Sequence, residues 1–434
     1  MNLAVLALAC KRQCLKQFGK IGSSSELSSL SEAMVRELLE DDELVVESEV
    51  DVCETLIKWL NSQIQSGHSV QPYHLLTLVR WSAVPVEYIK TRLITNTILM
   101  RDHQCFEFLS KVISYRLTGV QFNGLNTFHR PSTGVEQCVV IVGLDTGPEI
   151  SSDMLRASLQ KSDHVKNTDT IPTNMQYESA ACVSGKELYI TENGTDKNET
   201  WKWELVTGWT KCADLSEGRR RHCATFVNNT SMYVLGGYVD KAELTLDSIE
   251  QYNTVTNTWK KVGQLMHATR NTACSVYKTS IYVFGGVGVG QNDVDLDRVQ
   301  VFDTATKLCT ELTRRLPQPE GLLRAVMWDK SVLLINHRTC RIFDLEQQTF
   351  QQRDQFAAGN IHFGLVVENQ RLFIIGGGND QDSAGKMTWT CSDEVKSVAV
   401  MDIINNQTPA NWLHHATLPK PAVVHAFASM TLPT

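Results

Sequence analysis

The spacing of apolar residues changes once along the 434 residues of the chain, near Val135. Before this point apolar residues recur at three- and four-residue steps, which is the spacing of one face of an amphipathic helix. After it, apolar runs of roughly five residues alternate with polar turns, as in short β-strands. The pattern therefore predicts a multidomain chain in which an all-α part is followed by an all-β part.

The all-α part is expected to span residues 1–120, as antiparallel helices joined by short loops. Serines between residues 28 and 31 supply N-cap candidates for an early helix, and Pro85 should stop a later one. The predicted helices occupy residues 27–39, 50–60, 75–81, 89–99 and 105–113.

The first apolar run, Leu3–Ala9, could belong to a secretory signal peptide or to a buried helix. A signal peptide has a basic region ahead of the apolar run and a cleavage site behind it. Here no basic residue precedes the run, which leads directly into Lys11 and Arg12. A buried helix is therefore the interpretation that the residues favour.

The all-β part repeats one plan of four short strands. In residues 219–263 an apolar run ends on Gly236-Gly237, and Tyr252-Asn253 and Trp259 follow it. The next segment has the same order, with its glycine pair 49 residues further on. Four strands in about 45 residues is the size of one blade of a β-propeller.

Blade-like units can be laid out from residues 180, 219, 271, 323 and 363, and the run 138–143 belongs to another. Residues 144–174 are polar and weakly patterned, so long loops are expected there. The strand at residues 422–429 should pair with residues 138–143 and close a ring of about six blades. The predicted domains are a helical domain at 1–120, a linker at 121–136 and a propeller at 137–434, closed by strand 422–429.

Composition excludes several classes of protein. A net charge of −7 argues against a nucleic-acid binder, which would normally carry a basic face. No apolar run approaches the roughly 18 residues that span a bilayer, so no membrane partner is expected. The 12 cysteines show no framework of paired spacings, which favours reduced thiols and a cytoplasmic protein. A further pool in the nucleus or on the cytoskeleton is compatible with this expectation.

The glycine pair, the aromatic–Asn/Asp pair and the later tryptophan together resemble the kelch repeat. Gly236-Gly237, Tyr252-Asn253 and Trp259 carry this resemblance best. Two further units carry it partly, through Gly285-Gly286 with Phe302-Asp303 and through Gly376-Gly377 with Trp412.

Three units depart from the repeat, and irregular blades are expected there. Cys309 stands in the place of the tryptophan, Leu144 follows Gly143 where a second glycine belongs, and the unit from Leu323 has no glycine pair.

The helical part resembles the BACK domain, which precedes the kelch repeats in BTB–BACK–kelch proteins. The segments that carry this resemblance are residues 14–18, 27–31, 38–49, 59–60 and 75–81. The two resemblances cover nearly the whole chain, whereas a BTB domain is missing from it. The chain is thus expected to be a BTB-less isoform or fragment of a kelch-like protein.

The resemblance implies a substrate-recognition adaptor of a cullin-3-type RING E3 ubiquitin ligase, in the ubiquitin-like conjugation pathway. In this family the BTB domain dimerises and makes most of the contact with cullin-3, so cullin-3 binding by this chain should be weak or absent. Partners would then include BTB-containing family members. Since some kelch proteins bind actin filaments, a cytoskeletal scaffold is the alternative function.

By analogy with the family, partners bind at one mouth of the propeller, on loops that lead into each blade and loops after the glycine pair. Alignment of the units places one equivalent position at Glu178, His222, Asn271, Leu322 and His362. Five basic residues near this mouth favour an acidic peptide segment as the protein partner. The expected partner-binding residues are Tyr177, Glu178, Arg219, Arg220, Arg221, His222, Tyr238, Arg270, Asn271, Asn360 and His362.

No enzyme or cofactor chemistry is expected. Gly285–Gly290 follows a strand as a phosphate loop does, but no helix pattern opens after it and the lysine is missing. His414-His415 has no third metal ligand at a usable spacing. A propeller oxidase would need metal ligands and a redox cross-link, which no residues of the sequence supply.

Overall fold

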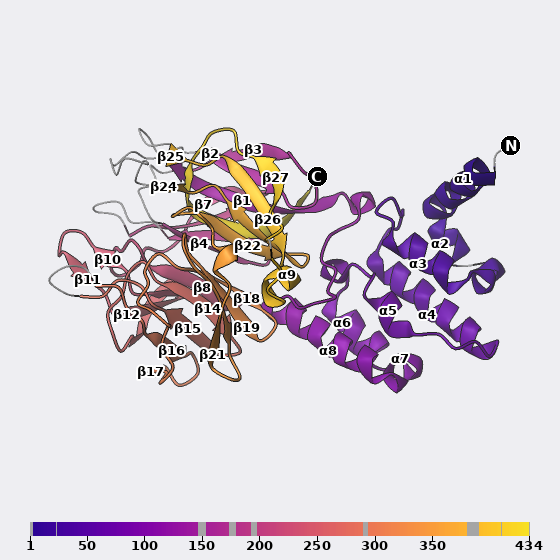
Figure 1. Cartoon of the computed structure of the whole chain (residues 1–434), viewed down its shortest axis with the longest axis horizontal. Helices are drawn as coiled ribbons and strands as arrows, with labels where there is room; N and C mark the ends of the chain where they lie inside the picture. The colour runs from indigo at the N-terminus through magenta and orange to yellow at the C-terminus, as the bar shows by residue number, and fades with distance from the viewer. Residues whose placement is uncertain are drawn as a thin grey trace. The chain divides into compact units, whose positions relative to one another are not determined.

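The computed structural model describes residues 3–22, 24–145, 153–172, 179–191, 198–289, 294–379, 390–408 and 410–433 (Figure 1). It divides into two compact units, Met1–Gln137 with Thr431–Thr434, and Cys138–Met430. The first is helical and the second is built of β-sheets, as the apolar spacing predicts. Within the described residues no helix is long and apolar enough to cross a membrane.

The helical unit contains eight α-helices among its described residues. They are α1 (Leu3–Lys16), α2 (Phe18–Ile21), α3 (Glu32–Glu40), α4 (Glu49–Gln65), α5 (Pro72–Leu76), α6 (Val86–Tyr88), α7 (Thr97–Arg101) and α8 (His103–Thr118). Short 3₁₀ turns occupy Ser25–Ser29, Trp81–Ala83 and Pro131–Thr133, and a π-helical turn occupies Ile89–Leu93.

Helix ends are set by local hydrogen bonds. The side chain of Asp102 caps α8 by accepting from the Gln104 N–H at 2.9 Å, and Gly119 ends the helix in the left-handed region, with φ +76°. Ser48 caps α4 by accepting from the Val50 N–H at 3.1 Å.

Three predicted helices are shorter than their apolar stripes. The helix predicted at residues 89–99 is divided at Asn96, whose side chain caps α7 by accepting from the Ile98 N–H at 3.0 Å. Residues 27–39 are divided at Ser31, because its hydroxyl caps α3 by accepting from the Met34 N–H. The helix predicted at residues 75–81 ends at Leu76, where the chain turns. Trp81 then donates its backbone N–H to Asn126 O and its indole N–H to Leu76 O, each at 2.9 Å.

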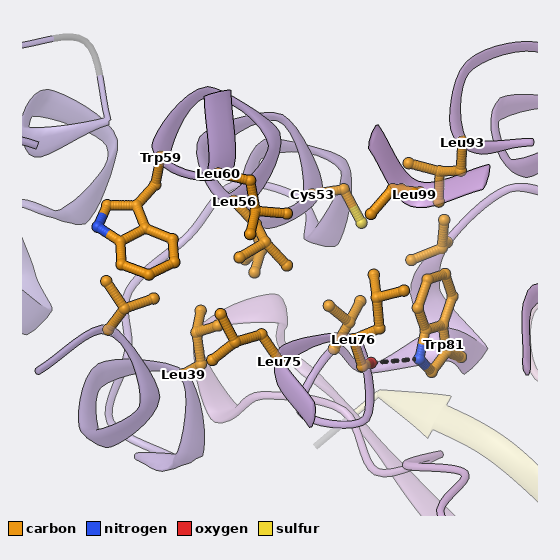
Figure 2. Packing of buried hydrophobic residues seen from close by; sticks show 14 of the residues in the cluster. Leu39, Cys53, Leu56, Trp59, Leu60, Leu75, Leu76, Trp81, Leu93 and Leu99 are labelled. Carbon is orange, nitrogen blue, oxygen red and sulfur yellow. Dashed lines mark hydrogen bonds between the residues drawn. The ribbon is translucent and has the colours of Figure 1, made fainter. Parts of the chain in front are cut away.

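The core of the helical unit lies between α4 and the helices that face it (Figure 2). Trp59 and Leu56 on α4 face Leu39 on α3 and Leu75 on α5, and all four are at most 2% exposed. Burial of each aliphatic side chain of this kind stabilises the fold by about 1.5–3 kcal/mol.

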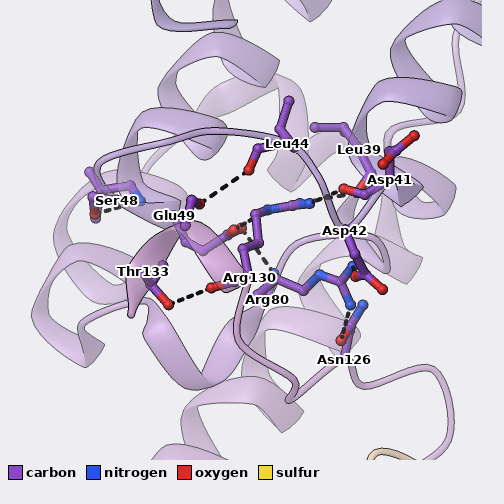
Figure 3. Close-up of polar contacts among 12 residues, drawn as sticks. Leu39, Asp41, Asp42, Leu44, Ser48, Glu49, Arg80, Asn126, Arg130 and Thr133 are labelled. Atoms are coloured by element: carbon purple, nitrogen blue, oxygen red, sulfur yellow. Dashed lines mark hydrogen bonds and ion pairs between the residues drawn. The ribbon is translucent and has the colours of Figure 1, made fainter. Parts of the chain in front are cut away.

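The segment predicted as a linker is bound to the helical unit (Figure 3). Arg130 is fully buried, and its guanidinium donates to Glu49 at 2.5 Å and to the carbonyls of Asp41 and Leu39 at 2.8 and 3.0 Å. Residues up to Arg130 therefore belong structurally to the helices.

The described residues form six four-stranded sheets, which are the blades of the propeller, and five of these sheets are antiparallel meanders of strands in chain order. In order from the innermost strand, blade 1 is β28 (Val423–Pro433), β1 (Val135–Asp145), β2 (Asp153–Ser158) and β3 (Val165–Thr170). Blade 2 is β4 (Ala180–Ser184), β5 (Glu187–Thr191), β6 (Thr200–Glu204) and β7 (Gly208–Lys211). Blade 3 is β8 (Cys223–Asn228), β9 (Ser231–Leu235), β12 (Ser248–Asn253) and β13 (Thr258–Gln264).

Blade 4 is β14 (Ala273–Tyr277), β15 (Ser280–Phe284), β16 (Val299–Asp303) and β17 (Cys309–Glu311). Blade 5 is β18 (Arg324–Trp328), β19 (Ser331–Ile335), β20 (Cys340–Asp344) and β21 (Thr349–Gln352). Blade 6 is β22 (Gly364–Glu368), β23 (Arg371–Ile375), β26 (Glu394–Ala399) and β27 (Leu413–Thr417), with helix α9 (Val400–Ile404) before β27. Two small hairpins add β10 (Tyr238–Val239) with β11 (Leu244–Thr245), and β24 (Gly378–Asn379) with β25 (Thr390–Cys391).

The innermost strands β4, β8, β14, β18 and β22 lie side by side in that order. The C-terminal strand β28 pairs with β1, so blade 1 combines strands from both ends of the unit. A ring closed in this way has no exposed inner edge.

Two expectations about the blades are wrong. Residues 144–174 do not form only long loops, because β2 and β3 lie within them and complete blade 1. β3 is mostly polar and half exposed, so it has no apolar alternation for a sequence pattern to detect. The units with departures from the repeat also form complete four-stranded blades, and in blade 5 Phe350 packs on Phe343 at 4.6 Å, as Trp259 packs on Tyr252 at 5.1 Å in blade 3.

Candidate functional site

One end of each blade carries two loops that could meet a partner. The leading loop connects the outermost strand of one blade to the innermost strand of the next. The loop between the second and third strands lies at the same end, because successive strands are antiparallel. Isolated backbone bridges join the two loops in three blades, at Arg220–Tyr238, Arg270–Val287 and Ile361–Gly378. We call this end of the propeller the mouth.

The glycine pair makes room for these loops. Gly236 has φ +61°, and a Cβ there would lie 2.3 Å from the carbonyl oxygen of Thr269 in the next leading loop. The neighbouring Gly237 donates its N–H to the same Thr269 oxygen at 2.9 Å. The pair therefore joins one blade to the next, and larger residues are excluded by space and by backbone conformation.

The leading loops of blades 3 to 6 each end in a residue of left-handed conformation, two positions before the innermost strand. These axial residues are Arg221 (φ +58°), Asn271 (φ +50°), Leu322 (φ +56°) and His362 (φ +50°). The alignment that placed His222 at this position is thus wrong by one residue. A register shift of β8 between Phe226 and Asn228 lengthens this unit and accounts for the error.

Backbone hydrogen bonds link the axial residues around the propeller axis. The Asn271 N–H donates to Arg221 O at 2.9 Å, and the Leu322 N–H donates to Asn271 O at 3.0 Å. The Val424 N–H donates to His362 O at 2.8 Å. These hydrogen bonds fix the backbone of the axial residues and therefore the positions from which their side chains extend.

A cavity of about 40 Å³ opens at the centre of the mouth. That is room for a few water molecules or one small polar head group. Its lining residues are Ser179, Arg221, His222, Asn271, Thr272, Leu322, Leu323, Arg324 and His362.

Arg219 does not face a partner, which corrects the expectation from the sequence. Its side chain is fully buried and forms an ion pair of 2.6 Å with buried Glu250. It also donates to the carbonyls of Gly236 and Ser248, at 3.1 and 3.0 Å. Burial lowers the pKa of Arg219, while Glu250 opposes this effect.

His222 lines the cavity as a neutral group. It is 7% exposed, and its Nε2 lies 2.7 Å from Thr191 Oγ1. Burial, and secondarily the charge of Arg219, lowers the pKa of His222 to about 3. The imidazole therefore adds no positive charge to the mouth at physiological pH.

Tyr238 contacts two guanidinium groups at the mouth. Arg270 lies 4.8 Å and Arg220 5.7 Å from the ring centroid. Arg220 forms an ion pair of 2.6 Å with Asp240, and Arg270, 5% exposed, donates to the hydroxyl of Thr245. These cation–π contacts hold the ring in place, so Tyr238 is a preorganised aromatic group on the mouth.

The remaining predicted residues fall into separate places. Asn360 donates its side-chain N–H to Gly376 O at 3.3 Å, so its amide braces the loop. Asn271 and His362 line the cavity. Tyr177 and Glu178 lie outside the described residues.

Sequence reasoning missed several cavity residues, above all Arg324. This residue begins β18, and its Nε donates to Phe363 O at 3.1 Å. The equivalent first residues of β8, β14 and β22 are Cys223, Ala273 and Gly364. The equivalent positions hold small residues, so the charged Arg324 at this position was the feature of the sequence that could have indicated a cavity residue.

The charge of the mouth is therefore distributed differently from the prediction. Of the five basic residues, Arg219 is buried in an ion pair, His222 is neutral and Arg220 is paired with Asp240. The cavity itself is lined by the guanidinium-bearing residues Arg221 and Arg324.

The described residues contain no group of three or more potential metal ligands. His414 illustrates why, because Asp163 lies 3.4 Å from its Nε2 and Glu394 lies 3.9 Å from its Nδ1, on opposite sides of the ring. Of the glycine-rich stretch 285–290, the last residue lies outside the described part, and residues 285–289 form no helix.

Two known families match parts of the chain. Residues 190–377 match the KLHDC2/KLHL20/DRC7 Kelch-repeats domain, and residues 1–93 match BACK, described as BTB And C-terminal Kelch.

Curated relatives match over most of the chain at low identity. Kelch-like protein 25 of Xenopus tropicalis is 22% identical over 84% of this chain and 64% of its own length. Kelch-like protein 35 of Mus musculus is 22% identical over 90% and 67% of the two chains. Kelch-like protein 38 of Rattus norvegicus is 22% identical over 95% and 70%. The chain thus spans about two thirds of the length of these relatives.

Helices that match BACK precede a six-bladed propeller in the chain, and residues 190–377 of that propeller match kelch repeats. On this evidence the chain belongs to the kelch-like family, with a BACK region followed by a kelch β-propeller.

Proposed function

We propose that this chain is a non-enzymatic substrate-recognition adaptor for a cullin-3-type RING E3 ubiquitin ligase. The family supports this proposal at a coarse level, because kelch-like proteins typically act as cullin-3 adaptors. In this proposal a BTB-bearing partner supplies most of the contact with cullin-3, and the propeller mouth holds the protein that is to be modified.

The observation that carries the proposal is the composition of the mouth. Arg221 and Arg324 line a polar cavity, and at the same mouth Arg220 and Arg270 contact the ring of Tyr238. Arginine and tyrosine, together with tryptophan, are enriched among the residues that contribute most to binding at protein interfaces.

An acidic peptide segment is the partner that fits this mouth. A carboxylate can accept paired hydrogen bonds from a guanidinium group in the cavity, and such charge-assisted bonds are stronger than neutral ones. Because the cavity is small, one acidic side chain would enter it while neighbouring residues of the segment contact Tyr238.

Affinity purification of the full chain with quantitative mass spectrometry tests the proposal. Proteins captured by the parent chain should be lost from Arg221→Ala/Arg324→Ala. The matched control is Lys260→Ala/Lys261→Ala, which removes two exposed positive charges from β13, the outermost strand of blade 3.

Capture that both double variants retain equally would overturn the assignment to the mouth. Enrichment of ubiquitin-ligase components supports the adaptor role. Co-sedimentation with actin filaments, without such components, would favour the cytoskeletal scaffold instead.

A further inference from the structure

Four blades carry a long polar side chain at one equivalent position of the third strand, opposite the fourth residue of the second strand. These anchoring residues are Glu250 in β12, Gln300 in β16, Arg341 in β20 and Lys396 in β26. Each reaches into the leading loop of its own blade.

The anchoring contacts differ in chemistry. Gln300 accepts from the His267 N–H at 2.8 Å, and Lys396 donates to Ala358 O at 2.9 Å. Glu250 accepts from Arg219 and also from the N–H of Ser216, at 3.0 Å. An acidic, an amide or a basic side chain can therefore stand at this position of the third strand, provided that the leading loop supplies a matching hydrogen-bond partner.

The loop side of this arrangement is also regular in three blades. Two positions before the axial residue stands a donor that bonds the carbonyl of the first glycine of the pair. These contacts are Arg219 to Gly236 O at 3.1 Å, Thr269 to Gly285 O at 3.1 Å and Asn360 to Gly376 O at 3.3 Å.

Blade 5 breaks this rule at both places. Asn336-His337 stands where the glycine pair belongs, and the loop residue is Glu320, whose carboxylate cannot donate when ionised. Glu320 instead accepts from Arg341 and, at 3.3 Å, from the Thr339 hydroxyl. Glu320 and Arg341 are 5% and 2% exposed.

The acid and the base have therefore exchanged places between blades 3 and 5. In blade 3 the loop holds the base, Arg219, and the third strand holds the acid, Glu250. In blade 5 the loop holds the acid, Glu320, and the third strand holds the base, Arg341. The reversal occurs in the one described blade of these four that lacks the glycine pair.

We propose that Glu320 and Arg341 are positioning residues, which hold the leading loop of blade 5 at the mouth through a charge-reversed version of the Arg219–Glu250 pair. The backbone of Glu320 accepts from the Gly286 N–H at 2.8 Å and donates to Leu296 O at 3.1 Å, so the loop also joins blade 4. Two residues later Leu322 begins the cavity lining that continues through Arg324. The consequence for partner binding rests on the proposed function, whereas the position of the loop does not.

Hydrogen exchange of the full chain, measured without any partner, tests this role. In Glu320→Gln the amides of residues 320–323 should exchange at least about tenfold faster, because Arg341 loses its ionic partner, while the amides of β15 remain protected. In Glu320→Arg/Arg341→Glu, which gives blade 5 the polarity of blade 3, exchange should return to within about threefold of the parent. The matched control is Arg315→Gln, which removes a nearby ion-paired arginine that is 46% exposed and should leave exchange unchanged.

Parent-like loop exchange in Glu320→Gln would overturn the proposal. If Glu320→Gln does not fold, the double variant Glu320→Arg/Arg341→Glu alone tests the proposal. A double variant that does not fold, or that does not protect the loop from hydrogen exchange, would also overturn the proposal. Loss of partner capture with an unaltered loop would contradict the positioning role and leave the proposed function intact. Faster hydrogen exchange of the loop with unaltered partner capture would count against the mouth as the binding surface.

Discussion

Arg219 and Glu250 form an ion pair of 2.6 Å in which both side chains are fully buried. Arg219 also donates hydrogen bonds to the carbonyl groups of Gly236 and Ser248, so the partners of its guanidinium lie within blade 3. Removal of one member of such a pair leaves the other charge buried without compensation.

We therefore predict that Arg219→Ala lowers the free energy of unfolding by about 3–5 kcal/mol. Urea unfolding of the full chain, followed by tryptophan fluorescence, measures this loss. The control is Arg315→Ala, an ion-paired arginine that is 46% exposed, for which less than about 1 kcal/mol is expected. A stable Arg219→Ala protein that has lost its partner would restore the interpretation of Arg219 as a contact residue.

The buried imidazole of His222 makes stability depend on pH. Its pKa is lowered from 6.5 to about 3, mainly by burial. Between these values the unfolded chain binds the proton and the folded chain does not, so stability is complete above about pH 6.5 and falls as the pH is lowered.

The contribution of His222 to this loss should be about 2 kcal/mol at pH 5. Unfolding of the parent and of His222→Gln between pH 7.5 and 5 measures it, since the variant cannot be protonated there. His68→Gln, at an exposed histidine, should keep the parental dependence on pH. An identical slope in the parent and His222→Gln would contradict a depressed pKa.

Gly236 and Gly185 separate two effects of adding a side chain, because both have φ +61°. At Gly185 a Cβ meets nothing within 4 Å, whereas at Gly236 it would lie 2.3 Å from Thr269 O. Gly185→Ala should therefore cost only the backbone strain, about 1 kcal/mol. Gly236→Ala should cost several times more, because blade 3 and the leading loop of blade 4 must move apart. Equal changes in the melting temperatures of the two variants would show that strain alone explains the glycine.

The repeated plan of the propeller could be predicted because the residues that build a blade are few and distinctive. Gly236-Gly237, Tyr252 and Trp259 stand at fixed steps, and their roles follow from size and backbone freedom alone. The polar strand β3 could not be found in this way, because its pairing with β2 rather than its own pattern makes it a strand.

The mouth was harder to predict, as the run Arg219, Arg220 and Arg221 illustrates. Three identical side chains follow one another, yet the first is buried, the second pairs with Asp240 and the third lines the cavity. Of the three, only Arg221 has a left-handed backbone. Residue type indicates charge, but only the path of the backbone decides which charge faces a partner.

In the helical unit, Arg130 and Glu49 form a fully buried ion pair 81 residues apart in sequence. Nearby, Arg80 pairs with Asp42 at 2.6 Å and donates to the side chain of Asn126 at 2.9 Å (Figure 3). These contacts hold the segment before the propeller against α4 and the loop that precedes it.

We predict that Arg130→Ala destabilises the helical unit by about 3–5 kcal/mol and exposes residues 121–133 to proteolysis. Arg130→Met/Glu49→Gln should be less damaging, because it removes both charges together and leaves no buried charge without a partner. Arg92→Ala is the control, since Arg92 is 63% exposed and pairs with Glu54 on the surface. Limited proteolysis and urea unfolding of the three variants measure the effect. If Arg130→Ala resists protease as the parent does, the segment is held by its apolar contacts instead, and the buried pair contributes little to its attachment.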